Sequence, residues 1–205
     1  MEPGSPPTEI PDPDAVIEGI RELCGEKDRK DLDFFLKGFD AGSLDRDFYE
    51  KAFSSKVGFI RDYYELDLNV RNIKTVFLNR ELGRREDMDV IPFETKEFER
   101  EKELEDILHG KDILERERGM DDFYWEEIDS LTAMEVFSFN LVLSFIAKLK
   151  IIGRWTRLNP DTGRELFRKF TEEIRSSSFA NAKHPYRRPQ ADKTPSPEER
   201  DIGRG

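Results

Sequence analysis

The sequence contains few of the residues from which metal and catalytic sites are usually built. Its 205 residues include one cysteine, Cys24, and two histidines, His109 and His184. A single cysteine excludes an internal disulfide, disfavours a structural zinc site and fits a reducing compartment. The histidines lie in a charge-rich segment and near the C-terminus, so a histidine-based triad or di-iron site lacks its parts. The sequence therefore predicts no metal and no cofactor.

The glycine-rich loops that bind phosphate groups are also missing. The chain contains neither Gly-x-x-x-x-Gly-Lys nor Gly-x-Gly-x-x-Gly, so nothing in it favours nucleotide binding. Carboxylates are abundant, but 45 acidic residues will often fall at helical spacing without any of them acting as an acid or a base. We therefore predict that the protein is not an enzyme.

Long hydrophobic runs are absent as well. The longest stretch without a charged residue, Val136 to Ala147, has twelve residues, whereas roughly 18 are needed to indicate a membrane-spanning helix. Residues 1–13 are rich in proline and acid, where a secretory signal would have a basic start and an apolar run. The expectation is a soluble, cytoplasmic protein.

Charge is what the sequence has in excess. Charged residues make up 39% of the chain and the net charge is -11, so non-specific binding to nucleic acid is disfavoured and basic or neutral partners are favoured. The hydrophobic content of 36% is enough for one sizeable core or two small ones.

Helical patterns account for most of the chain and predict an all-α fold. Asp12 is a candidate N-cap, Pro13 fits a first turn, and a following apolar stripe stops at Gly25. Apolar residues at helical spacing predict a second helix over 32–39 and a shorter third over 48–53. We expect a flexible N-terminus over 1–11, a helical domain over 12–175 and a disordered tail over 176–205, where apolar periodicity is absent.

The cleanest periodicity predicts a helix over 56–81. One stripe alternates steps of four and three, and consists of Phe59, Tyr63, Leu66, Val70, Ile73 and Phe77. Asn69, Asn72 and Asn79 lie on the remaining side, where short amides form helices poorly. Two interpretations stay open: the amides bind water or backbone, or they contact another helix or protein.

The second half of the chain alternates between charged and apolar segments. Residues 93–122 hold 12 acidic and 6 basic residues, which predicts a solvated helical arm that breaks at Gly110. Residues 131–152 are apolar on nearly every side, which predicts one central helix. Asn159 and Pro160 then fit the start of the last helix.

Residues 112–167 carry the most specific pattern. The charged run Glu115-Arg116-Glu117-Arg118 leads to Trp125, and the apolar helix leads to Ile151-Ile152-Gly153-Arg154-Trp155 and then Gly163-Arg164-Glu165-Leu166-Phe167. In this order the residues resemble the DUF2764 family, a bacterial family associated with V/A-type rotary ATPases and thought to take the place of their C-type stalk subunit. The family is longer and has a tyrosine-rich, strand-like start that residues 1–13 do not resemble.

A second stretch points in the same direction. The sequence Asp67-Leu68-Asn69-Val70-Arg71-Asn72-Ile73, followed by Arg80, resembles the Asp, Asn-Ile and Arg pattern of helices in the C-type stalk subunit, also called the d-type. The arginine follows the Asn-Ile pair at a greater distance here than in that family.

The resemblance implies a function and a shape. It implies a single elongated or funnel-like helical bundle that links the membrane rotor ring to the central stalk, and is peripheral to the membrane through these partners. Partner-binding residues would then include Asn69, Asn72, Arg80, Arg154 and Trp155. Composition and periodicity agree equally well with a helical interaction or regulatory module unrelated to the ATPase.

Arg154 and Trp155 have two interpretations that differ in what mutation does. As a core residue, Trp155 would stabilise the fold, whereas as an interface anchor it would stabilise binding. We predict that Trp155 belongs to the core and that Arg154 contacts a partner.

Overall fold

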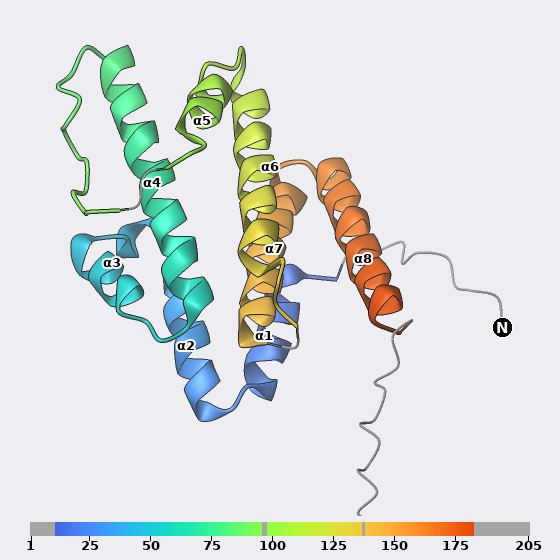
Figure 1. The fold of residues 1–205 in the computed structure, drawn as a ribbon. Helices are drawn as coiled ribbons and strands as arrows, with labels where there is room; N and C mark the ends of the chain where they lie inside the picture. Colours follow the sequence, from blue (N-terminus) through green and yellow to red (C-terminus); the bar gives the residue numbers. More distant parts are fainter. Residues whose placement is uncertain (1–10, 96–97, 137, 183–205) are drawn as a thin grey trace, which may run out of the picture. The chain divides into compact units, whose positions relative to one another are not determined.

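The computed structural model describes residues 11–95, 98–136 and 138–182, with side chains through Ser176. Figure 1 shows helices and connecting loops, and no strand occurs in this part of the chain, so the predicted all-α fold is confirmed. The helices are α1 (Pro13–Leu23), α2 (Glu26–Lys37), α3 (Arg46–Phe53), α4 (Gly58–Glu81), α5 (Glu101–Leu108), α6 (Ile113–Thr132), α7 (Phe139–Leu158) and α8 (Pro160–Ala182), with a short 3-10 helix, η1 (Ala41–Ser43).

The chain divides into two compact units after Leu166. The first contains α1 to α7 and the opening turns of α8, and the second begins with the rest of α8. Because α8 continues to Ala182, the predicted start of a disordered tail at residue 176 is too early. The rest of that predicted tail, 183–205, and most of the predicted flexible N-terminus, 1–10, lie outside the described residues.

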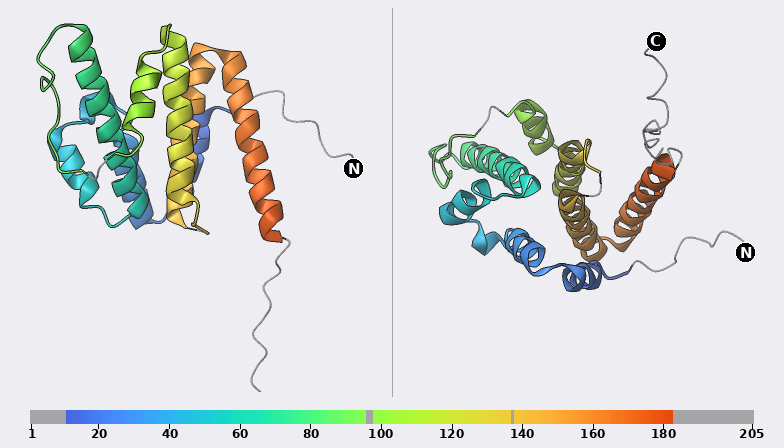
Figure 2. Two further views of the ribbon diagram at one scale, coloured as in Figure 1. Left: turned by 45° about the horizontal axis from the view of Figure 1, so that its top comes forward. Right: turned by 60° about the horizontal axis from the view of Figure 1, so that its bottom comes forward.

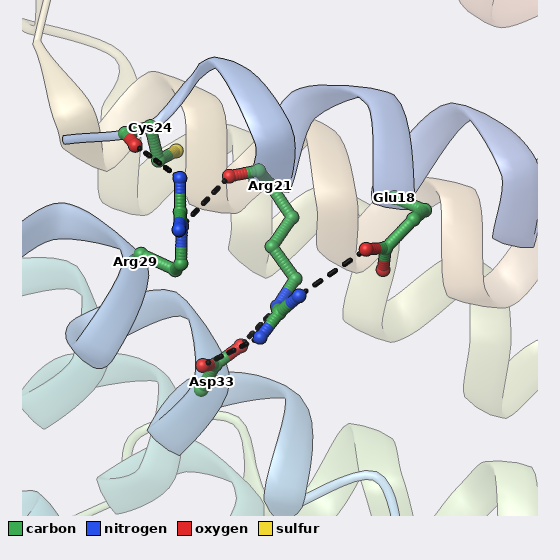
Figure 3. Close-up of polar contacts among 5 residues, drawn as sticks. All are labelled: Glu18, Arg21, Cys24, Arg29 and Asp33. Carbon is green, nitrogen blue, oxygen red and sulfur yellow. Dashed lines mark hydrogen bonds and ion pairs between the residues drawn. The ribbon is translucent and has the colours of Figure 1, made fainter. Parts of the chain in front are cut away.

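The first helix begins as the sequence predicts. The Asp12 carboxylate accepts a hydrogen bond from the backbone N–H of Asp14, and Pro13 occupies the first turn. A salt bridge of 2.6 Å between Arg21 Nε and Asp33 Oδ1 then joins α1 to α2. Arg29 donates to the backbone carbonyls of Arg21 and Cys24 at the end of α1, so both arginines fix the turn between the helices (Figure 3).

The predicted apolar stripe of α1 is only partly buried. Ile17 is 4% exposed, whereas Leu23 is 89% exposed, although both lie on the stripe. Leu23 is the last residue of α1, next to the turn into α2.

Aromatic side chains form the core between α2, α3 and α4. Phe35 is fully buried and contacts the rings of Phe59, Tyr63 and Tyr64 at centroid distances of 5.2 to 5.7 Å. The Tyr64 hydroxyl donates to the Phe35 carbonyl near the end of α2. A side chain at Gly38 would overlap the Tyr64 phenol, so the close approach of α2 to α4 requires glycine there.

The segment predicted to be a solvated arm is only partly solvated. The predicted break at Gly110 is confirmed, because α5 ends at Leu108 and α6 begins at Ile113. However, Leu104 and Leu108 are 0% and 6% exposed, and they pack in one cluster with Leu66, Val70, Phe77, Met120 and Phe123. The prediction of an exposed arm is wrong for α5 because its few apolar residues all fall on one face.

The central helix begins and ends later in the sequence than predicted. Residues 131–152 do not form one helix, because α6 ends at Thr132 and α7 runs from Phe139 to Leu158. The Ser138 hydroxyl accepts a hydrogen bond from the Leu141 N–H, so it caps a new helix instead of lying within one. Met134 and Val136, which the prediction placed in the core, are 95% and 64% exposed.

The central position of this apolar helix is confirmed. α7 contacts α1, α2, α4 and α6, and it lies beside α6 in Figures 1 and 2. Gly153, Arg154 and Trp155 lie inside α7, not after its end as the sequence indicated. Within the described residues, no helix has both the length and the apolar character needed to cross a bilayer.

Candidate functional site

Arg154 and Trp155 lie in a polar seam between α6 and α7. Arg154 Nη1 lies 2.9 Å from Glu117 Oε2, and its Nη2 donates to Asp121. The indole N–H of Trp155 donates to the same Asp121 oxygen. The side chain of Asp121 is 9% exposed and that of Arg154 is 39% exposed, so the acidic partner is buried and the basic partner reaches the surface.

A second contact extends the seam by two turns. Lys148 Nζ lies 2.5 Å from Asp129 Oδ1 and 4.7 Å from the centroid of the Trp125 ring. On α6 the contributing residues recur every four positions and therefore share a face: Glu117, Asp121, Trp125 and Asp129. On α7 Lys148 and Trp155 are seven residues apart, which also places them on one face. We call these α6 and α7 residues, with Arg154, the α6–α7 seam.

The electrostatics of the seam reflect its burial. Removal from water raises the pKa of Asp121, and the hydrogen bonds from Arg154 and Trp155 offset this shift only in part. Both donors therefore favour the ionised form of Asp121, against the effect of its burial.

The predicted core position of Trp155 is confirmed, because the residue is 3% exposed. Both Nη groups of Arg154 bind carboxylates of α6. Its side chain is also 39% exposed, so the contact between Arg154 and a partner stays a prediction.

The asparagines of α4 bind the segment that follows the helix, two of them through its backbone and Asn69 through a side chain. Asn72 donates to the Ile91 carbonyl at 2.9 Å and accepts from the Ile91 N–H at 3.1 Å. Asn79 donates to the carbonyls of Glu86 and Met88, and Asn69 accepts from the Thr95 hydroxyl. These amides therefore hold the segment after α4 along the helix, and the interpretation that they bind backbone is confirmed for Asn72 and Asn79.

Arg80 lies on the exposed part of α4. Its guanidinium approaches Glu86 at 3.1 Å and Glu105 at 3.5 Å, and its side chain is 52% exposed. The five residues predicted to bind a partner thus fall into two groups, one facing the segment after α4 and one facing α6.

Two concavities border the seam. The larger, of about 890 Å³, lies beside the start of α6, where Ile113, Leu114, Arg118 and Trp155 line it. Ile113 and Leu114 are 74% and 65% exposed, so this groove has an apolar rim. It continues to Asn159, Thr162 and Glu165 at the beginning of α8.

The smaller concavity, of about 250 Å³, lies on another side of the seam. Its lining includes Tyr63 and Asp67 from α4, Tyr124 from α6, and Lys150 and Arg154 from α7. Phe39 and neighbouring residues after α2 complete it. We call this concavity the Asp67 cleft.

The sequence did not identify Asp67, Asp121 or Lys148 as site residues, although Asp67 belongs to the motif of α4. The four-residue spacing from Glu117 through Trp125 to Asp129 was the available signal for the seam. Across the part of the chain with described placement, no group of three or more His, Cys, Asp or Glu side chains is arranged to hold a metal ion.

The α6–α7 seam lies within the part of the chain that matches a known protein family. Residues 92–178 match the family described as "Protein of unknown function (DUF2764)". The match includes α5, α6, α7 and most of α8, and excludes α1 to α4. No curated protein and no solved structure matches the chain.

Proposed function

We propose that this protein is a non-catalytic coupling subunit of a V/A-type rotary ATPase, which joins the membrane rotor ring to the central shaft. The observation that carries the proposal is the DUF2764 pattern over 112–167, within the family match over 92–178. The link from that family to the ATPase rests on the resemblance of these residues and of the α4 motif to the C-type stalk subunit.

The packing of the pattern residues supports a mechanical role. Glu117 and Trp155, which are 38 positions apart along the chain, meet the same Arg154–Asp121 group. Gly163 allows α8 to start close to α7, because a Cβ there would lie 2.7 Å from Thr156 Cα. The residues that distinguish the pattern thus hold α6 against α7 and allow the first turn of α8 to start close to α7. Closely packed interiors compress little and transmit strain.

Exposure divides the five candidate partner-binding residues. Arg154 and Arg80 have side chains that are 39% and 52% exposed, so both reach a partner without local unfolding. Asn69 and Asn72 bind the segment 91–95, and Trp155 is buried, so these three support the surface from within. We therefore assign the direct contacts to the two arginines.

Co-expression of the full chain with the central-stalk and ring subunits of a V/A-type ATPase tests this assignment. We expect co-elution in size-exclusion chromatography, and an affinity loss of about 2 kcal/mol or more for Arg154→Ala, as expected of an interface anchor. Arg80→Ala is a second variant that leaves the α6–α7 seam intact. Arg21→Ala is the matched control, since it removes an exposed, paired arginine from α1.

Circular dichroism of each variant separates a loss of contact from a loss of fold. Failure of the wild-type chain to co-elute with any stalk or ring subunit would contradict the coupling role and favour the unrelated interaction module. ATP hydrolysis by the isolated chain, abolished by a point substitution, would contradict the non-catalytic assignment.

A further inference from the structure

Asp67 is a carboxylate in the protein interior whose hydrogen-bond donors are neutral. The Tyr49 hydroxyl donates to Oδ2 at 2.7 Å, and the Tyr124 hydroxyl donates to Oδ1 at 3.2 Å. Among the residues with described side chains, no lysine or arginine forms an ion pair with it. Arg71 and Lys74, on the following turns of α4, act on it only through space. An ionised carboxylate offers about four lone-pair sites, so two phenols leave acceptor capacity unused.

Asp67 lines the Asp67 cleft, and aromatic rings line the same cleft. Phe39, Tyr63 and Tyr124 all belong to the lining. The Tyr63 ring lies 5.9 Å from Phe39 and 6.3 Å from Tyr124, at interplanar angles of 35° and 36°. Aromatic rings and a carboxylate therefore line one cleft, and this combination of groups attracts organic cations.

The two basic residues of the lining already have acidic partners. Lys150 Nζ lies 2.8 Å from Asp14 Oδ1, and Arg154 binds both Glu117 and Asp121. Both cations are therefore paired with carboxylates, whereas Asp67 has no ion-pair partner and interacts with Arg71 and Lys74 only through space.

The size of the cleft limits what it can hold. Its volume of about 250 Å³ is below the roughly 300–1,000 Å³ of clefts that take drug-sized ligands. A group the size of a single side chain fits this space.

We propose that the Asp67 cleft binds a guanidinium or primary ammonium group, with Asp67 as the counter-ion and the rings of Phe39, Tyr63 and Tyr124 as the wall. The cation is either a small molecule or an arginine or lysine side chain of a partner. This inference does not depend on the rotary ATPase assignment.

Titration of the full chain with agmatine and with the peptide acetyl-Gly-Arg-Gly-amide tests the proposal. Binding is followed by the NMR signals of the Tyr63 and Tyr124 rings and by calorimetry. We expect saturable binding of at least one probe that Asp67→Asn weakens tenfold or more. The matched control is Asp62→Asn, which removes the same charge from the same helix outside the cleft and should change the affinity less than twofold.

The two probes separate the sources of the cation. Tighter binding of agmatine indicates a small-molecule ligand, and tighter binding of the peptide indicates a partner side chain. The proposal is overturned if neither probe saturates the wild-type chain below about 10 mM, or if Asp67→Asn binds as tightly as the wild type. A melting curve of Asp67→Asn checks that the variant is folded.

Discussion

Asp67 and Asp121 border the same cleft, but the protein compensates their charges in different ways. Asp121 lies in the α6–α7 seam, where a guanidinium and an indole N–H donate to it. Asp67 lies beside the aromatic core of α2 to α4 and receives hydrogen bonds from two phenols. Burial raises the pKa of both carboxyl groups, so neither environment fully replaces water.

The two carboxylates differ in whether a basic side chain is bound to them. In the seam, each acidic group has a basic partner, and loss of that partner removes the cationic part of its compensation. In the aromatic region, the carboxylate has neutral donors and free acceptor capacity beside an open cleft. Ion pairs in the seam therefore join α6 to α7, whereas Asp67 has no ion-pair partner and is the group that we propose to bind a cationic ligand.

The largest expected effect is at Trp155, whose ring fills the core side of the seam. Trp155→Ala should lower the free energy of unfolding by about 3–5 kcal/mol, because it leaves a cavity and frees Asp121 of one donor. Chemical denaturation measures the change. Trp155→Phe keeps most of the ring and should cost clearly less, and equal costs for the two variants would show that the hydrogen bond dominates.

Breaking the ion pair of the seam should have the next largest effect. Arg154→Ala should cost about 1–3 kcal/mol at neutral pH, because it leaves the buried Asp121 charge with the indole as its remaining donor. Since Asp121 already has a raised pKa, acidification should protonate it and reduce this cost. A cost that stays constant as the pH falls would contradict the role assigned to Asp121.

Removal of the Asp67 charge should not lower the free energy of unfolding, in contrast to the two substitutions above. A raised folded-state pKa means that the folded protein binds the proton more tightly than the unfolded chain. Its stability should therefore decrease as the pH rises above the usual aspartate range of about 4 and through the raised value. Asp67→Asn removes this loss, so at neutral pH it should be neutral or stabilising by about 1 kcal/mol.

Urea denaturation of both proteins from acidic to neutral pH measures the Asp67 effect. The advantage of Asp67→Asn should disappear toward acidic pH, where the wild-type carboxyl is itself protonated. Strong destabilisation at neutral pH would show that Asp67 is a structural group like Asp121.

The smallest effect is expected at the exposed salt bridges of α1 and α2 in Figure 3. The side chains of Arg21 and Asp33 are 37% and 46% exposed, so water screens their attraction. Arg21→Ala should therefore change the free energy of unfolding little, and less than any of the substitutions above. A loss comparable to that of Arg154→Ala would mean that burial is not what distinguishes the seam.

The fold was predictable from the sequence where local chemistry was sufficient. Asp12 and Pro13 determine the start of α1, and the apolar stripe from Phe59 to Phe77 determines α4. The break near Gly110 also followed from the sequence. These features depend on neighbours within one or two helical turns, and periodicity reports such neighbours directly.

The break between α6 and α7 was not predictable in this way. The apolar residues around Val136 satisfy a helical pattern, and no glycine or proline interrupts it between Met134 and Ala147. The break depends on the Ser138 cap and on the Asn140 side chain, which donates to Glu135 and accepts from the Phe59 N–H. Phe59 is 81 residues away along the chain, so only the packed structure brings this acceptor and donor together.

For the candidate site too, the sequence identified some residues and the packed structure was needed to identify the others. The sequence identified Arg154 and Trp155 and predicted that the tryptophan is buried, because apolar periodicity and residue type report burial. It identified neither Asp121 as their shared acceptor nor the tyrosines around Asp67, which lie 18 and 57 positions from it. Hydrogen bonds between helices depend on how the helices pack, and that packing, not the local sequence, determined which buried carboxylate has a cationic partner.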